Sequence, residues 1–184
     1  MTIPNLITML RVVLVPAVVL AMLQARWDWA FAGLVVAGIS DGVDGFIARR
    51  FNQQSRFGAY LDPIADKLLL VSVFVVMGII GQLPLWLVVT MVSRDALIVC
   101  AVLLSTAMAH PVEMKPLLVS KANTAVQIVL AAVVLGELAF AVHLDPLRPG
   151  LILLSGVLTV ASAAAYLVAW LRHMSGYGEG GKSG

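Results

Sequence analysis

Long apolar runs, interrupted at short intervals by charged residues, glycine or proline, set the pattern of this chain. A membrane-spanning helix needs about 20 mostly apolar residues to cross about 30 Å of hydrocarbon, and six runs have this length. They cover approximately residues 5–23, 29–50, 59–80, 83–109, 117–142 and 147–171. The pattern predicts an all-α fold, an integral membrane bundle of six transmembrane helices.

The composition agrees with a membrane protein. Of the 184 residues, 61% are hydrophobic and 12% are charged, whereas a soluble domain is about 45–50% apolar and about 25% charged. The net charge of +2 gives no reason to expect a nucleic-acid partner. We expect one membrane domain over residues 1–175, with no room for a separate soluble domain, and a flexible glycine-rich tail over residues 176–184.

Basic residues fall unevenly between the two sides that such a bundle would present. Arg49, Arg50 and Arg56 surround the second connection, and further basic residues lie near the fourth connection and after the last run. The other side has Arg26 and Arg148, each near an aspartate. The positive-inside rule therefore predicts that both termini and the second and fourth connections are cytoplasmic.

Four aspartates interrupt the second and third runs at helical spacings. Asp41 and Asp44 are three residues apart, and Asp62 and Asp66 are four apart, so each pair projects from one face of its helix. A tight turn near Asn52 would make the two helices antiparallel and bring the pairs together. Charges at such positions are costly and usually functional, and clustered carboxylates suit hard divalent cations. The array therefore predicts a metal site at the cytoplasmic ends of these helices.

Small residues and an arginine accompany the aspartates. Gly45, Ala48 and Gly58 share the same helix faces and would let a ligand approach the backbone, while Arg49 offers a bidentate fork to a phosphate. The pattern favours metal-assisted chemistry on a phosphate-bearing substrate. Two alternatives stay open. The charges could be interfacial residues neutralised by nearby basic side chains, or the chain could be a divalent metal-ion carrier, although its acidic residues gather at one interface.

The complete pattern Asp-x2-Asp-Gly-x2-Ala-Arg-x8-Gly-x3-Asp-x3-Asp runs from Asp41 to Asp66. It resembles the signature of the CDP-alcohol phosphatidyltransferases, which are integral membrane enzymes of lipid head-group synthesis. The segment from Pro4 to Arg11 is similar to the N-terminal Pro-Asn-x2-Thr-x2-Arg segment of the same family. The resemblance therefore covers nearly the whole chain, up to about Arg172.

This resemblance implies roles for the motif residues. Two divalent cations, Mg²⁺ or Mn²⁺, would be held by Asp41, Asp44, Asp62 and Asp66, and Asp66 would also be the catalytic base. The CDP and diphosphate parts of CDP-diacylglycerol would be bound by Asn5, Thr8, Asp44, Gly45, Ala48, Arg49 and Gly58. The family resemblance also implies a homodimer.

Two later segments narrow the comparison within the family. Residues 92–95, Val-Ser-Arg-Asp, and residues 119–127, which contain Ser-Lys-Ala-Asn-Thr-Ala, resemble the mitochondrial-type cardiolipin synthases. This resemblance implies transfer of a phosphatidyl group from CDP-diacylglycerol to phosphatidylglycerol, with release of CMP. The site would face the cytoplasm at a bacterial-type inner membrane, or the matrix at the mitochondrial inner membrane. The acceptor would be bound by Arg94, Lys121, Asn123 and Thr124.

The acceptor assignment has alternatives. Arg94 could form a structural pair with Asp95, and Lys121 could be an interfacial residue whose amine reaches the membrane surface. The connection over residues 110–116 is shorter than in the mitochondrial enzymes. A phosphatidylglycerophosphate synthase would use the same chemistry with glycerol 3-phosphate, whose nearly two charges need two or more basic side chains. Arg94, Lys115 and Lys121 could supply them.

Overall fold

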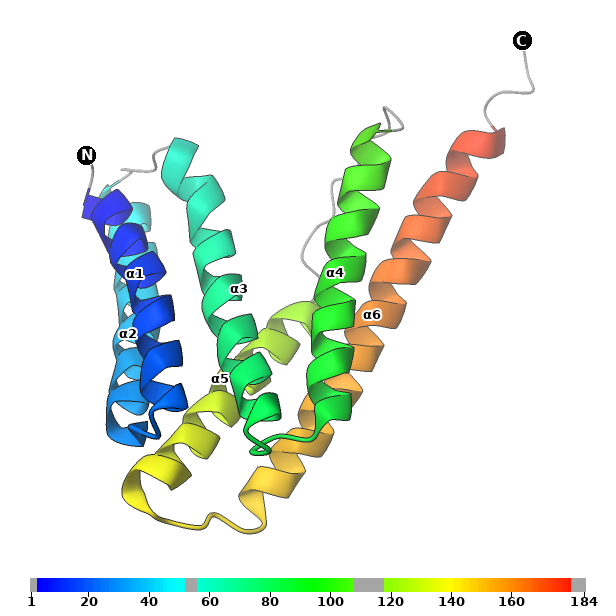
Figure 1. The fold of residues 1–184 in the computed structure, drawn as a ribbon. Helices are drawn as coiled ribbons and strands as arrows, with labels where there is room; N and C mark the ends of the chain where they lie inside the picture. The colour runs from blue at the N-terminus through cyan, green and yellow to red at the C-terminus, as the bar shows by residue number, and fades with distance from the viewer. Residues whose placement is uncertain (1–2, 52–55, 108–117, 180–184) are drawn as a thin grey trace.

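The computed structural model describes residues 3–51, 56–107 and 118–179, and the surroundings of the side chains of residues 12–40, 67–101 and 118–171. The described residues form six α-helices (Figure 1). The helices are α1 (Ile3–Leu23), α2 (Trp27–Phe51), α3 (Arg56–Ile79), α4 (Leu85–Ala107), α5 (Leu118–Phe140) and α6 (Leu147–Glu179).

The predicted all-α fold is confirmed, because each apolar run coincides with one helix to within a few residues. α6 is the exception. It continues to Glu179, past the expected end at residue 171 and into the segment expected to be a flexible tail. Pro149 is the last proline of the chain, so no residue beyond the first turn of α6 lacks the N–H that a helix requires. Residues 180–184 lie outside the described part.

Figure 1 shows the helices converging toward the lower end of the view, and side chains from the helices form one buried core. α1 packs against α2 and α3, α5 packs against α6 and α2, and α4 packs against α6. α3 also contacts α4 and α5, so that both α2 and α3 join the N-terminal helices to the C-terminal ones. Phe74, Met77, Leu87, Leu130 and Leu135 are among the largest fully buried side chains.

Figure 1 shows that the helices other than α5 run between an upper and a lower end of the bundle. The start of α1, the end of α2, the start of α3 and the ends of α4 and α6 lie at the upper end of the view. The connections from α1 to α2, from α3 to α4 and from α5 to α6 lie at the lower end. The end of α2 and the start of α3 therefore lie at the same end of the bundle as the start of α1 and the end of α6, as the predicted topology requires.

Two of the described helical segments are long and apolar enough to cross a membrane: Leu118–Phe140 and Leu147–Leu171. The segments Val12–Leu23, Trp27–Ser40 and Lys67–Ile79 are apolar but shorter. Every helix exposes large apolar side chains, such as Val13, Trp29 and Leu118, as a surface in contact with hydrocarbon would. These features are those of a membrane protein, while the crossing of all six helices stays a prediction.

A partly buried ion pair links helices at the lower end of the bundle. Glu137 of α5 accepts a hydrogen bond from Arg148 Nη1 at 3.0 Å through Oε2 and from the Leu144 N–H at 2.8 Å through Oε1. Arg148 also donates to the backbone carbonyl of Gln82 and, at 3.1 Å, to its side-chain oxygen. The sequence pattern gave Glu137 no role and placed Arg148 near an aspartate. In the structure, the pair of Glu137 and Arg148 links the α3–α4 connection to the α5–α6 connection, and this pair is called the clasp below.

Candidate functional site

The predicted aspartate array lies on two uninterrupted helices. Asp41 and Asp44 belong to α2, and Asp62 and Asp66 belong to α3. Both segments reach the upper end of the bundle in Figure 1. Because both helices are continuous there, the spacings of three and four residues keep each pair on one helix face.

The surroundings of this predicted site are not among those that the structure describes. The side chains that lie outside the described surroundings are those of Asn5, Thr8, Asp41, Asp44, Gly45, Ala48, Arg49, Gly58, Asp62 and Asp66. The donor chemistry of four carboxylates suits Mg²⁺ or Mn²⁺, so the sequence and the helix spacing fit the expected metal pair. Among the side chains that are described, no group of three potential metal ligands occurs.

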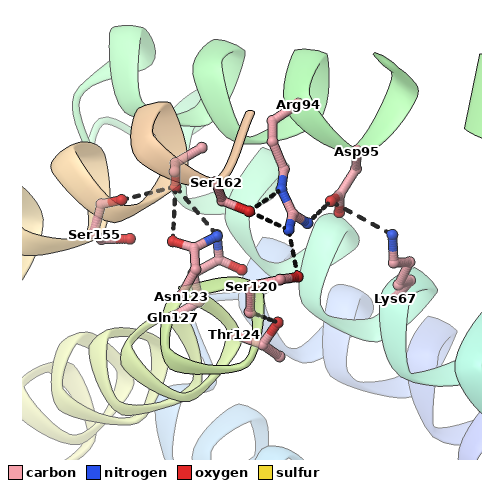
Figure 2. A network of polar contacts seen from close by, with 10 residues as sticks. Lys67, Arg94, Asp95, Ser120, Asn123, Thr124, Gln127, Ser155 and Ser162 are labelled. Atoms are coloured by element: carbon pink, nitrogen blue, oxygen red, sulfur yellow. Dashed lines mark hydrogen bonds and ion pairs between the residues drawn. The ribbon is translucent and has the colours of Figure 1, made fainter. Parts of the chain in front are cut away.

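The described part of the site is built around Arg94 of α4 (Figure 2). Its side chain is 5% exposed. Nε and Nη2 donate to the Ser162 hydroxyl of α6 at 3.2 and 2.7 Å, and Nη2 also donates to the Ser120 hydroxyl of α5 at 2.6 Å. The guanidinium lies 5.5 Å from the ring centroid of Tyr166. Arg94 therefore ties three helices together while most of its N–H groups are occupied.

Asp95 gives this arginine its counter-charge. Arg94 Nη1 lies 2.5 Å from Asp95 Oδ1, and the amine of Lys67 lies 3.5 Å from the same oxygen. Lys67 follows Asp66 directly in the chain. The pair of Asp95 with Lys67 thus connects the helix that carries two predicted metal ligands to the Arg94 cluster. A structural pairing of Arg94 with Asp95 was one alternative open from the sequence, and the structure contains it.

A second polar cluster lies beside the first, between α5 and α6. The Thr159 hydroxyl lies 3.0 Å from Asn123 Oδ1 and 2.7 Å from the carbonyl of Ser155, and it accepts from Gln127 Nε2 at 3.5 Å. Asn123, Thr159 and Ser155 are fully buried. Asn123 Nδ2 and the Ser155 hydroxyl have no hydrogen-bond partner among the described residues. Unpaired polar atoms in an apolar interior are costly, so close packing alone does not explain why these polar residues are buried here.

The structure brings together three of the four predicted acceptor residues. Arg94 and Thr124 belong to the first cluster in Figure 2, where the Thr124 hydroxyl donates to the Ser120 carbonyl at 3.2 Å, and Asn123 belongs to the second cluster beside it. Lys121 is exposed, and no hydrogen bond or ion pair joins it to the clusters within the described residues. It points away because it is two residues before Asn123 on the same helix, which places it on another face.

Sequence analysis missed the contribution of α6. Ser155, Thr159 and Ser162 follow one another at steps of four and three residues, and all three are fully buried. A polar stripe at helical spacing in an apolar helix is a recognisable signal. It would have identified the face of α6 that meets α4 and α5, although not the residues that it meets.

Two hollows border the Arg94 cluster. A cavity of about 40 Å³ lies between α3, α4 and α5, and its polar lining comes from Lys67, Arg94, Asp95, Thr124 and Gln127. A larger hollow of about 350 Å³ lies between α4 and α6 and is lined by apolar side chains apart from Arg94 and Tyr166. The cluster thus lies between a small cavity with several polar side chains in its wall and a larger, almost entirely apolar hollow.

Comparison with known proteins identifies the family. The model of the CDP-alcohol phosphatidyltransferase family matches residues 1–171. The chain belongs to this family. The resemblance read from the motif between Asp41 and Asp66 is therefore confirmed at the level of the family.

Relatives of this CDP-alcohol phosphatidyltransferase carry names of two different activities. The "Cardiolipin synthase (CMP-forming)" of Rattus norvegicus is 34% identical over 155 residues, which cover 76% of this chain and 51% of the relative. The "Probable cardiolipin synthase (CMP-forming)" of Drosophila melanogaster is 34% identical over 184 residues, covering 91% and 57%. The "CDP-diacylglycerol--glycerol-3-phosphate 3-phosphatidyltransferase" of Escherichia coli is 42% identical over 102 residues, covering 52% and 56%. The chain spans about half the length of the curated relatives it matches.

Proposed function

We propose that this protein is a cardiolipin synthase that transfers the phosphatidyl group of CDP-diacylglycerol to phosphatidylglycerol and releases CMP. One observation carries the choice of acceptor. The two segments that resemble cardiolipin synthases, residues 92–95 and 119–127, meet around Arg94, Ser120 and Thr124 in the folded chain. The cardiolipin synthases among the relatives, at 33–34% identity over 76–91% of this chain, support the same choice.

The charge balance around Arg94 supports a lipid acceptor over glycerol 3-phosphate. A phosphate monoester carries nearly two negative charges and needs two or more basic groups free to bind it. Here Arg94 and Lys67 share the carboxylate of Asp95, and Lys121 is exposed. The apolar hollow of about 350 Å³ beside Arg94 also suits a substrate with hydrocarbon chains. Phosphatidylglycerol, with one negative charge and two chains, fits both features.

The aspartate motif would activate both substrates. Asp41, Asp44, Asp62 and Asp66 would hold two divalent cations, Mg²⁺ or Mn²⁺, which bind the diphosphate and polarise the phosphoryl group when present. Asp66 would accept the proton of the acceptor hydroxyl as its oxygen bonds to phosphorus. Arg49 would donate to the diphosphate. Asn5, Thr8, Gly45, Ala48 and Gly58 would line the space for the CDP moiety.

The same proposal includes a membrane arrangement. All six helices would cross a bacterial-type inner membrane, or the mitochondrial inner membrane, with both termini and the aspartates at the cytoplasmic or matrix side. The shared end of α2 and α3 in Figure 1 supports this arrangement, as do the exposed apolar side chains on every helix. CMP would leave to the aqueous side while the lipids enter from the bilayer. We further propose that the protein works as a homodimer.

An acceptor assay tests the proposal. The purified chain in mixed micelles is given labelled CDP-diacylglycerol and, in separate reactions, phosphatidylglycerol, glycerol 3-phosphate or inositol phosphate. We expect labelled cardiolipin and CMP with phosphatidylglycerol alone. Transfer to glycerol 3-phosphate in its place would instead identify a phosphatidylglycerophosphate synthase. Uptake of divalent metal into liposomes without any CMP release would identify a metal-ion carrier.

A further inference from the structure

The small cavity between α3, α4 and α5 has several polar side chains in a wall that is mostly apolar. Its volume is about 40 Å³, and a group the size of a water molecule needs about 10–15 Å³ on this measure. The cavity therefore has room for about three such groups. Its rim includes Lys67, the residue that follows the predicted base Asp66. A molecule in this space would lie next to the helix segment that carries the second aspartate pair.

The polar groups around the cavity match a hydroxylated ligand. Asp95 binds both of its cations through Oδ1, and its Oδ2 has no hydrogen-bond partner among the described residues. Gln127 adds an amide that is about nine-tenths buried, and Thr124 adds a hydroxyl. A hydroxyl group both donates and accepts, so it can use the carboxylate of Asp95 and the amine of Lys67 together. The remaining lining is apolar, from residues such as Phe74 and Val71.

The ion pairs around the cavity favour an uncharged group over an anion. Arg94 and Lys67 are both paired with Asp95, so a phosphate would have to displace this carboxylate to be bound by them. An uncharged diol can form hydrogen bonds beside these pairs without breaking them.

We propose that this cavity receives the free glycerol end of the acceptor lipid, and that Asp95 determines specificity by accepting a hydrogen bond from its middle hydroxyl. The inference rests on the proposed function, because it presupposes a phosphatidylglycerol acceptor. The reacting terminal hydroxyl would then be held beside α3, while Lys67 and Thr124 border the same group (Figure 2). Asp95 is not among the acceptor residues that the family resemblance implied.

Acceptor analogues and one charge-removing variant test the role of Asp95. The purified full chain in mixed micelles is assayed for CMP release with phosphatidylglycerol and with phosphatidyl-1,3-propanediol, which keeps the terminal hydroxyl but lacks the middle one. We expect the unmodified protein to prefer phosphatidylglycerol at least tenfold in kcat/KM, because a hydrogen bond to a charged group is then lost. Asp95→Asn should reduce that preference at least fivefold, with KM for CDP-diacylglycerol unchanged within twofold. An equal loss of activity toward both acceptors would show that Asp95 only positions Arg94, and would overturn the proposal.

A cavity-filling variant tests occupation of the space while keeping every polar group. Val71→Met adds volume at the cavity wall and should raise KM for phosphatidylglycerol about tenfold. Leu68→Met, on the half-exposed face of the same helix, is the matched control and should leave both KM values unchanged within twofold. An unchanged KM for phosphatidylglycerol in Val71→Met would mean that the cavity holds water only, and would overturn the inference alone. Absence of CMP release from the unmodified protein with phosphatidylglycerol would overturn the proposed function as well.

Discussion

The clasp between Glu137 and Arg148 gives a stability prediction whose size follows from its geometry. The side chains are 7% and 26% exposed, and the two atoms of the ion pair are 3.0 Å apart. Removing one partner of a fully buried pair costs about 3–5 kcal/mol, and the partial exposure of Arg148 lowers this figure. Glu137→Gln keeps an oxygen for the Leu144 N–H and loses the charge. We therefore expect it to lower the free energy of unfolding by about 2–3 kcal/mol.

Glu137→Ala should cost more than Glu137→Gln, because it also leaves the Leu144 N–H without its acceptor. A lost hydrogen bond to a charged group adds about 1–3 kcal/mol. In the double variant Glu137→Gln/Arg148→Gln no unpaired charge remains, so it should be less destabilised than the sum of the single variants by about 2 kcal/mol. Asp145→Asn is the matched control, because Asp145 is an exposed acid close to Arg148 in sequence and takes no part in the clasp.

Thermal unfolding of the purified protein in detergent, followed by circular dichroism, measures these differences. At about 2–4 °C per kcal/mol for a chain of this size, Glu137→Gln should lower Tm by roughly 5–10 °C. Asp145→Asn should leave Tm within about 2 °C. Additive single variants, or a Glu137→Gln protein as stable as the unmodified one, would refute the reasoning, because the pair would then contribute nothing to the fold.

The remaining predictions concern helix packing and the aspartate motif. Gly33→Ala should lower Tm, because the added Cβ would lie 2.5 Å from Cγ2 of the buried Val18 and overpacking costs about 1–3 kcal/mol. Gly38→Ala is the control: Gly38 has open space around it, so this variant should be neutral or slightly stabilising. Equal effects of the two substitutions on Tm would contradict this packing. Asp44→Asn and Asp66→Asn should each abolish CMP release with the elution profile of the folded protein unchanged, and near-normal turnover would rule out the proposed mechanism. EDTA should stop CMP release and added Mg²⁺ or Mn²⁺ should restore it, whereas activity in EDTA would contradict a metal role for the aspartates.

Helix positions and family were accessible from the sequence because both depend on local patterns. An apolar run of about 20 residues is itself the signal for a helix in hydrocarbon, and all six runs became helices. The motif from Asp41 to Asp66 could be read for the same reason, since its spacings lie within two neighbouring helices. Helix ends were less predictable, and α6 continued to Glu179 where glycines suggested a tail.

Partner choice across the bundle was decided by the tertiary structure. Arg94 reaches Ser120 and Ser162, which lie 26 and 68 positions away in the chain, and Arg148 reaches Gln82, which lies 66 positions away. Lys121 and Asn123 looked equivalent in the motif, yet one is exposed and the other is fully buried. Hydropathy determined that the helices form, because backbone hydrogen bonds close within each helix. Which polar faces meet depends on how the helices pack, and that is a property of the whole bundle that no local spacing contains.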